Sequence, residues 1–311
     1  MFAALFSKSG LSLDRLRSFL EMAEAGGIAK AAPGDPVRQS QISRQIRELE
    51  EFFGTELTQR RGKGLVLTPA GRRLAGLVRG QIQGLDDFRR EQEGRPKVFV
   101  FGAGTSTLES LVAPRLPSLA EALGGAQLHT ASYRSHALVE AVREGSVDFA
   151  VVRRDAIAEP SKRNCLPLAK VTFHLCVPKR LMPRGAGLAD LSDPDLWAKL
   201  PFASGRDGGQ LDRAIREAMA KAGLSFHPRF ECGSMLQVRQ LVAQGSCAAV
   251  LPGLALPGLD EKRIFVAPYE PLASYGRILV LHWSPRQVEM RGIVTRQIEA
   301  AAAILAEKRD G

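Results

Sequence analysis

A change of pattern at Arg95-Pro96 constrains the fold of this 311-residue chain more than any other feature. Before it, apolar residues recur with the 3.6-residue period of helices. After it, short apolar runs alternate with helical segments, which is typical of strands and helices in an α/β region with parallel strands. A chain of this length also favours about two domains. The sequence therefore predicts a helical amino-terminal region followed by an α/β region.

The helical region begins with two helices and a turn between them. The first helix has Ser12 or Asp14 near its start, and Gly26-Gly27 ends it. A short segment over residues 28–32 follows, and Pro33-Gly34-Asp35-Pro36 predicts a turn. A second, strongly amphipathic helix is expected from Ser40 to Phe53, where Gly54 supplies the stop.

A basic, glycine-rich segment follows the second helix. Residues 57–67 contain Arg60-Arg61-Gly62-Lys63-Gly64 between apolar runs, and this pattern predicts a small hairpin or wing. Thr68-Pro69 then opens another helix, because Thr is a good N-cap and Pro fits the first helical position. We expect its narrow apolar stripe to meet a partner helix in a dimer; packing on its own domain is the alternative. The stripe comprises Leu74, Leu77, Val78, Ile82, Leu85 and Phe88.

Strands and helices alternate after residue 97 in two blocks. The first has strands Val98–Phe101, Gln127–Ala131 and Val147–Val152 and helices Leu108–Leu123 and Ser135–Glu144. The second has strands Val171–Val177, His227–Glu231 and Ala248–Leu251 and helices Leu211–Ala222 and Leu236–Gln244. A strand over Ile278–His282 and a helix over Val288–Glu307 close the chain. Such alternation is typical of parallel sheets.

Composition and charge narrow the class of protein. Apolar residues make up 45% and charged residues 24%, which is ordinary globular composition and argues against disorder. The formal net charge is +10, which suggests an anionic partner such as nucleic acid. No acidic residue interrupts the stretch between residues 57 and 85, so it forms a positive strip suited to DNA phosphates or the minor groove. Its basic residues are Arg60, Arg61, Lys63, Arg72, Arg73 and Arg79.

Several classes lack their sequence signals. No run of about eighteen apolar residues predicts a membrane span, and residues 1–6 do not form a secretory signal. The four cysteines have no CxxC spacing and the histidines are scattered, so we expect no metal site and mostly buried thiols. No Gly-x-Ser-x-Gly, phosphate-binding loop or His-Glu-x-x-His motif indicates an enzyme. The expectation is a reduced, cytoplasmic protein without a cofactor.

The start of the second long helix carries side chains that hydrogen-bond base edges and phosphates. A helix in the major groove reads bases with its N-terminal residues. The acidic turn at residues 48–51 restricts this role to the first half of the helix; a solvated helix start is the alternative. The candidate DNA contacts are Arg38, Gln39, Ser40, Ser43, Arg44 and Arg47 near the helix start, and Arg60, Arg61 and Lys63 in the wing.

The first strand of the α/β region runs into Gly102-Ala103-Gly104-Thr105-Ser106-Thr107. Free N–H groups at a helix start favour anions, and the hydroxyls can orient a carboxylate. Gly-x-Gly also begins a dinucleotide fingerprint, but Thr107 replaces the third glycine. Plain N-capping by Ser or Thr is the alternative to ligand contact. A dinucleotide-dependent α/β enzyme with a helical appendage therefore stays open as a second function.

The residues from Ser43 to Leu74 read SRQIRELEEFFGTELTQRRGKGLVLTPAGRRL. This pattern, together with Ala31-Ala32, Val37 and Gln39, resembles the LysR-type transcriptional regulators. A weaker resemblance continues through residues 138–151 and 240–252. In this family the recognition segment contacts DNA bases. The resemblance places Gln39, Ser43 and Arg44 of this chain in that segment.

The resemblance implies an α plus α/β architecture in three parts. These are a winged helix-turn-helix over residues 11–68, a linker and dimerisation helix over 69–95, and an effector domain with two α/β lobes similar to periplasmic binding proteins. Lobe I is expected over 97–168 and 276–307, and lobe II over 169–275. The implied partners are double-stranded DNA, a small anionic effector between the lobes, and identical subunits in a homodimer or homotetramer.

Matching positions suggest the effector site. Arg206 is suited to pair a carboxylate with two parallel hydrogen bonds, although a surface arginine is the alternative. A DNA-binding protein without any effector is a third possible function. The candidate effector contacts are Gly104, Thr105, Ser106, Thr107, Ser135, Ser204, Arg206, Gly233 and Ser234.

This chain also departs from the family pattern. It has Arg38-Gln39-Ser40 where the family commonly has Ser-Gln-Pro, and Leu57-Thr58 where it has Leu-Phe. Residues 33–36 replace a continuous helical segment with two prolines. Because Pro36 has no N–H and disfavours a helical residue before it, the short helix is expected to be truncated.

Overall fold

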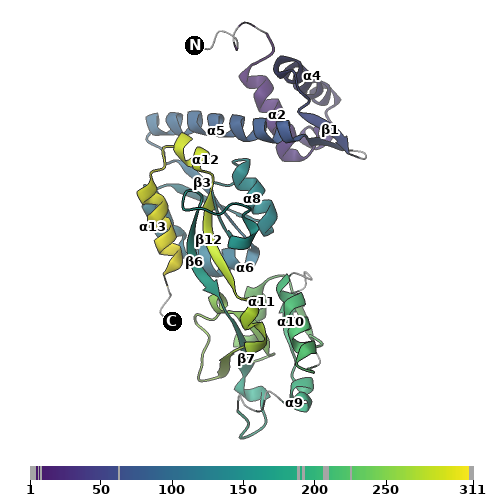
Figure 1. Cartoon of the computed structure of the whole chain (residues 1–311), viewed down its shortest axis with the longest axis vertical. Coiled ribbons are helices and arrows are strands. Elements are labelled where there is room, and N and C mark those ends of the chain that lie inside the picture. Colours follow the sequence, from purple (N-terminus) through teal and green to yellow (C-terminus); the bar gives the residue numbers. More distant parts are fainter. Residues whose placement is uncertain are drawn as a thin grey trace. The chain divides into compact units, whose positions relative to one another are not determined.

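The computed structural model describes residues 5, 7, 9–61, 64–187, 190, 193–205, 210–224 and 226–307 (Figure 1). The chain divides into two compact units. Unit 1 contains Met1–Lys97, Glu140–Asp148 and Ser284–Ile293. Unit 2 contains Val98–Val139, Phe149–Trp283 and Val294–Gly311.

Three helices open unit 1: α2 (Leu13–Ala25), α3 (Ile28–Ala31) and α4 (Pro36–Phe53). The Ser12 side chain accepts a hydrogen bond from the first turn of α2, as its position predicted. Gly26, with a φ of 70°, ends α2 in the left-handed conformation that favours glycine. The truncated helix is confirmed, because α3 has four residues.

Helix α4 begins at Pro36 rather than at the expected Ser40. The Asp35 side chain accepts a 2.9 Å hydrogen bond from the backbone N–H of Arg38 and so caps the helix. Pro36 occupies the first turn, where its missing N–H costs nothing. The two prolines therefore shorten α3 but lengthen α4.

The predicted wing is a two-stranded antiparallel hairpin, β1 (Thr58–Arg61) and β2 (Gly64–Leu67). Helix α5 (Pro69–Gln92) follows, and the Thr68 hydroxyl accepts the N–H of Gly71 at 3.0 Å, as expected of an N-cap. A Cβ atom on Gly71 would lie 2.0 Å from the carbonyl oxygen of Leu57, so only glycine fits there. One apolar core joins these elements; it includes Phe19, Met22, Ile42, Ile46, Leu49, Leu57 and Val78.

Helix α5 continues along two further segments of unit 1, Glu140–Asp148 and Ser284–Ile293. Gln287 Nε2 donates a 3.0 Å hydrogen bond to the carbonyl of Gly76, and Gln83 Nε2 donates a 3.2 Å bond to the carbonyl of Gly145. A Cβ atom on Gly80 would lie 2.4 Å from Gln287 Oε1. Glycines in α5 therefore allow this close approach.

The apolar stripe of α5 has two different halves. Val78 is buried, and Leu74 and Ile82 pack against the core of the same unit, as the alternative interpretation had it. Leu85 and Phe88 are 58% and 62% exposed. The second half of the stripe therefore stays free in the single chain.

Unit 2 contains a five-stranded sheet in the order β4-β3-β5-β12-β6. Strands β4 (Gln127–Ser132) and β5 (Phe149–Arg153) pair in parallel with β3 (Val98–Ala103). Strand β12 (Arg277–Trp283) runs antiparallel to β5 and to β6 (Cys165–Val171). The parallel pairing expected from the alternation is present among β3, β4 and β5. The sheet as a whole is mixed, because β12 returns to it in the opposite direction after more than a hundred residues.

The second block of unit 2 is also mixed. Strand β7 (Phe173–Pro178) pairs antiparallel with β10 (Ala249–Pro252) and β11 (Ile264–Pro268). The strand expected over Val171–Val177 is β7, except that Val171 is the last residue of β6, which belongs to the other sheet. Only β8 (Ala203–Gly205) and β9 (Phe230–Cys232) pair in parallel among the strands described in this block. Its helices are α9 (Pro194–Lys199), α10 (Gln210–Lys221) and α11 (Met235–Ala243).

Two long helices expected from the sequence are interrupted. The one over Leu108–Leu123 consists of a π turn, a 3-10 turn and α7 (Leu116–Ala122), since Pro114 and Pro117 cannot donate backbone hydrogen bonds; the short helix α6 (Thr105–Thr107) precedes it. The closing helix splits into α12 (Pro285–Met290) and α13 (Thr295–Ala306) around Gly292, whose φ is 65°. Helix α8 (Ser135–Arg143) forms as expected.

The cysteines mostly serve as apolar side chains. Cys165, Cys176 and Cys247 are buried, as predicted, and Cys232 is half-buried. Burial raises the pKa of the Cys176 and Cys247 thiols to about 12, so both stay protonated at neutral pH. Within the described ranges, no three His, Cys, Asp or Glu side chains gather as metal ligands would. None of the described helices has the length and apolar character needed to cross a membrane.

Candidate nucleic-acid interface and effector site

Helix α4 presents one polar face to solvent and one apolar face to the core. Val37 is 80% exposed and the Arg44 side chain 72% exposed, whereas Ile42 is fully buried. Ser40 and Arg47 are exposed as well. A surface hollow of about 540 Å³ follows this face and is lined by Pro36, Val37, Ser40, Gln41 and Arg44. The polar side chains on the outward face of α4 therefore make no contact with the core.

Two of the predicted contacts are held by the protein itself. Gln39 Nε2 donates a 2.7 Å hydrogen bond to the carbonyl of Ala32, which ties α4 to the end of α3. Arg38 forms a 2.6 Å ion pair with Glu21 and also donates to Ser18 and Gln41. These side chains position α4 on α2 and α3 in the single chain.

Glu21 sits between two arginines of this region. Its side chain accepts hydrogen bonds from Arg17 at 2.7 Å and from Arg38 at 2.6 Å. The hydrogen bond from Arg17, and then that from Arg38, hold the pKa of the Glu21 carboxyl below its usual value. Glu21 is therefore charged at neutral pH and neutralises part of the cationic surface near the start of α4.

The wing places Arg60 and Arg61 on the surface, where both are exposed. Lys63, the third predicted wing residue, lies outside the described residues. Glu50 accepts hydrogen bonds from the backbone N–H groups of Leu57 and Thr58, at 2.8 and 3.0 Å. This carboxylate fixes the base of the wing to α4, a role that the acidic turn in the sequence did not reveal.

A buried ion cluster joins three segments of unit 1. The guanidinium of Arg291 pairs with Asp87 at 2.8 Å and with Asp148 at 2.7 Å, and its side chain is 3% exposed. Burial opposes the charge, but the hydrogen bonds that Arg291 donates to Asp87 and the charges of both carboxylates outweigh it and raise the pKa of Arg291. Sequence reasoning missed this cluster because the partners are far apart along the chain.

The predicted effector residues form two groups at strand ends in unit 2. Thr105, Ser106 and Thr107 follow β3, and Ser135 follows β4; these strands are parallel, so they end at one edge of the sheet. The Thr105 hydroxyl lies 2.8 Å from the hydroxyl of Ser132 at the end of β4. Gly104 is the N-cap residue of α6 and uses no side-chain cap. Capping of α6 therefore does not account for the hydroxyls of Thr105, Ser106 and Thr107.

The second group lies at the ends of the parallel strands β8 and β9. Ser204 is 2% exposed, and its hydroxyl has no hydrogen-bond partner among the residues described. Gly233 donates its N–H to Gln237 Oε1 at 2.9 Å, and Ser234 caps α11. Arg206 lies outside the described residues.

Two family models match the chain in the same order as its parts. Residues 13–72 match the model described as bacterial regulatory helix-turn-helix protein, lysR family. Residues 92–294 match the LysR substrate binding domain. Together they cover most of the sequence, and the chain belongs to the LysR family of DNA-binding transcriptional regulators with an effector-binding domain.

Individual relatives support the same assignment. The HTH-type transcriptional regulator TdcA of Escherichia coli is 22% identical over 296 residues, which cover 93% of this chain and 89% of TdcA. The regulator BbuR of Bordetella bronchiseptica is 28% identical over 248 residues, 78% of this chain and 75% of BbuR.

Solved structures of full-length LysR regulators share the fold. LysG from Corynebacterium glutamicum, with bound effector Arg, has a TM-score of 0.61 at 18% identity and covers 95% of this chain and 98% of its own. Full-length CbnR complexed with its target DNA has a TM-score of 0.53 at 18% identity, with coverage of 94% and 100%. The winged helix-turn-helix and the α/β domain expected from the sequence are thus confirmed.

Proposed function

We propose that this regulator reads DNA with the exposed face at the start of α4 and answers to a small anionic effector in unit 2. The observation that carries the first part is the solvent-facing row Ser40, Arg44 and Arg47 on a helix whose opposite face is buried. A helix with this arrangement fits the major groove through its N-terminal half.

Each predicted DNA contact then has a distinct role. Arg44 and Ser40 meet base edges or phosphates, with Ser43 and Arg47 beside them. Arg60, Arg61 and Lys63 of the wing neutralise phosphates or enter the minor groove. Arg38 and Gln39 hold α4 in place, and they reach DNA only when their present partners release them.

The effector part rests on the hydroxyl and glycine groups at the strand ends of unit 2. Strand carboxyl ends are where open α/β sheets bind ligands. The Ser204 hydroxyl, buried and without a partner among described residues, is suited to donate to a carboxylate. The proposed contacts remain Gly104, Thr105, Ser106, Thr107, Ser135, Ser204, Arg206, Gly233 and Ser234.

The remaining parts of the proposal follow from a role on DNA. The winged helix-turn-helix occupies residues 11–68, the linker helix 69–95, lobe I 97–168 and 276–307, and lobe II 169–275. Exposed Leu85 and Phe88 on α5 are suited to pair subunits into a dimer or tetramer. The protein acts in the cytoplasm, where bacterial DNA lies, and it regulates rather than catalyses.

The test of the DNA interface is Arg44→Ala in the full chain. Loss of this contact is expected to cost about 1–3 kcal/mol, or about 5- to 150-fold in affinity. Fluorescence anisotropy on a fragment selected from genomic DNA measures the affinity. Arg89→Ala removes an arginine on α5 that is exposed like Arg44 and serves as the matched control. Equal affinity of the Arg44 variant and the wild type would refute the assignment.

The test of the effector site is a thermal-shift screen of small carboxylates. A ligand that binds only the folded state raises the unfolding temperature in proportion to the logarithm of its concentration. The shift should shrink in Ser204→Ala and persist in Ser161→Ala, an exposed serine elsewhere in unit 2. An ultraviolet cofactor spectrum in the purified protein would instead support the dinucleotide-dependent enzyme.

A further inference from the structure

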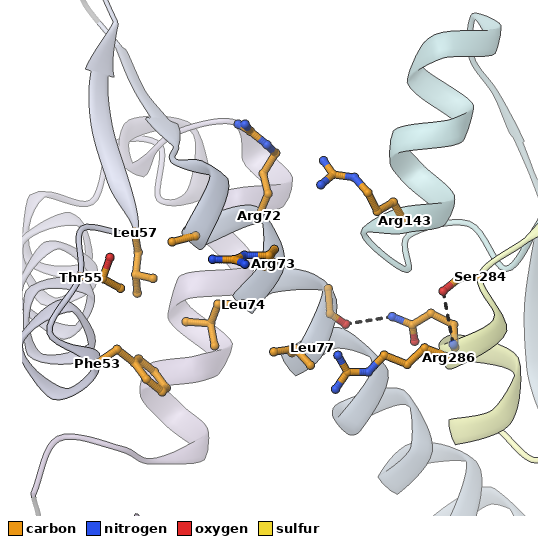
Figure 2. Close-up of a pocket in the computed structure, with 13 residues that line it drawn as sticks. Phe53, Thr55, Leu57, Arg72, Arg73, Leu74, Leu77, Arg143, Ser284 and Arg286 are labelled. Atoms are coloured by element: carbon orange, nitrogen blue, oxygen red, sulfur yellow. Dashed lines mark hydrogen bonds between the residues drawn. The ribbon is translucent and has the colours of Figure 1, made fainter. Parts of the chain in front are cut away.

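Unit 1 contains a cavity of about 600 Å³ that the DNA interface does not use (Figure 2). One side of it is apolar and comes from the winged helix and the first turns of α5. Leu57 and Leu74 line this side together with Phe53, whose ring is 38% exposed. Leu77 continues the apolar surface further along α5.

Four arginines from three chain segments surround the same cavity. Arg72 and Arg73 come from α5, Arg143 from the end of α8, and Arg286 from α12. Figure 2 shows their guanidinium groups distributed around the cavity, with the apolar side chains of Phe53, Leu57 and Leu74 to one side. None of the residues lining the cavity is acidic.

The charges of these arginines are only partly balanced. Arg143 pairs with Glu140, and Arg72 donates a 2.8 Å hydrogen bond to the carbonyl of Leu67. Arg73 and Arg286 are exposed and form no ion pair within the described part of the chain. Guanidinium groups collected at one cavity repel one another, so an anion placed among them lowers the free energy.

We propose that this cavity binds a small amphipathic anion, a carboxylate or a phosphate monoester that carries an apolar chain or ring. Its volume lies in the range of small-molecule sites, about 300–1,000 Å³. The apolar side takes the chain or ring, and the planar guanidinium groups pair with the acidic oxygens. All lining residues belong to unit 1, whereas every candidate effector residue belongs to unit 2, so this is a second site.

The position of the cavity gives such a ligand a regulatory consequence. A bound anion contacts Arg73 at the base of the wing-bearing segment and Arg286 on α12 at the same time. It therefore links the part of unit 1 that faces DNA to the segments with which α5 packs. The site supplies an input to the DNA-binding unit that does not depend on the effector lobes.

The experiment uses the full chain and the fluorescent anion anilinonaphthalene sulfonate as the probe. Decanoate and decyl phosphate compete for it in separate titrations, which distinguishes a carboxylate from a phosphate ligand, and decanol tests the need for charge. The double variant Arg73→Gln/Arg286→Gln should weaken decanoate or decyl phosphate about tenfold or more. The control Arg163→Gln/Arg296→Gln removes two exposed arginines of unit 2 and should bind like the wild type.

Three outcomes would overturn the proposal. The double variant binds both anions as tightly as the wild type, or decanol competes as well as decanoate. In the third, a duplex of random sequence displaces the probe and the double variant loses duplex affinity by the same factor, which would make the arginines a DNA phosphate surface. A Ser204→Ala variant should leave the probe affinity unchanged, so a failure of the effector assignment does not affect this result.

Discussion

Two regions of unit 1 use arginine in opposite ways. At the start of α4 and in the wing, Arg44 and Arg60 project into solvent, and among the described residues the one ion contact of Arg44 is with Glu48 at 3.7 Å. At the far end of α5, Arg291 is enclosed by two carboxylates. An enclosed guanidinium joins chain segments and is closed to ligands, whereas an exposed one is available to an anion at little cost in desolvation.

Arg38 lies between these extremes. It stands in the segment that the sequence assigned to DNA, yet Glu21 and Ser18 hold it in the single chain. Residue type and position in the sequence therefore did not separate the arginines proposed to bind DNA from those that hold the fold. The carboxylates in contact with each guanidinium separate them.

The largest effect is expected for the enclosed arginine. Arg291→Ala leaves Asp87 and Asp148 buried without their cation, and breaking such a buried pair costs about 3–5 kcal/mol. Urea unfolding of the full chain measures the loss. Arg89→Ala removes an exposed arginine that pairs with Asp86 on the same helix, and it should change the free energy of unfolding by no more than about 1 kcal/mol. Similar losses in both variants would remove the distinction drawn above.

A smaller effect is expected for the wing. Arg60→Gln removes one phosphate contact, so the slope of log affinity against log salt concentration should become shallower by about one unit. The urea midpoint should stay at the wild-type value because Arg60 is exposed. Anisotropy titrations at four or more salt concentrations give the slope. An unchanged slope would show that the wing arginine does not lie on DNA.

The smallest effect is expected for Arg38, the arginine that Glu21 holds near the start of α4. Glu21→Gln removes a negative charge and releases Arg38, so affinity for a random duplex should rise about two- to threefold at neutral pH. The pKa of Glu21 is lower in the folded protein than its usual value of 4.5. The ion pairs of Glu21 therefore contribute their full stabilisation at pH values above 4.5. That stabilisation is lost as the pH falls through the lowered pKa.

The unfolding temperatures of Glu21→Gln and wild type should therefore differ at pH 7 and converge in acid. Glu48→Gln removes a half-buried carboxylate that pairs with Arg15 and contacts Arg44, and it provides a comparison at a second carboxylate of this region. A weaker duplex affinity in Glu21→Gln would contradict the release of Arg38.

Local signals in the sequence predicted local structure well. Ser12 and Thr68 cap their helices because a hydroxyl at that position satisfies a free N–H whatever the rest of the fold does. The wing followed from a glycine-rich turn between apolar runs. The start of α4 was missed because Asp35, read as a turn residue, caps the helix instead.

Features that depend on distant segments were beyond the sequence. The direction of β12 is set by the path of the chain through the second block, and periodicity carries no strand direction. The Arg291 cluster joins residues from three segments that are far apart in the sequence, and no local pattern in any of them indicates which residues pair. For the proposed DNA interface, the sequence predicted an amphipathic helix with a polar start, but it carried no sign that Gln39 bonds to the carbonyl of Ala32.

The missing side chain at Gly71 has a mechanical consequence. The carbonyl of Leu57, directly before the wing, fills the space that a side chain on α5 would need. The backbone before the hairpin and the first turn of α5 are therefore in direct contact, with no side chain between them. A rotation of α5 about its axis would therefore move the first strand of the wing with it.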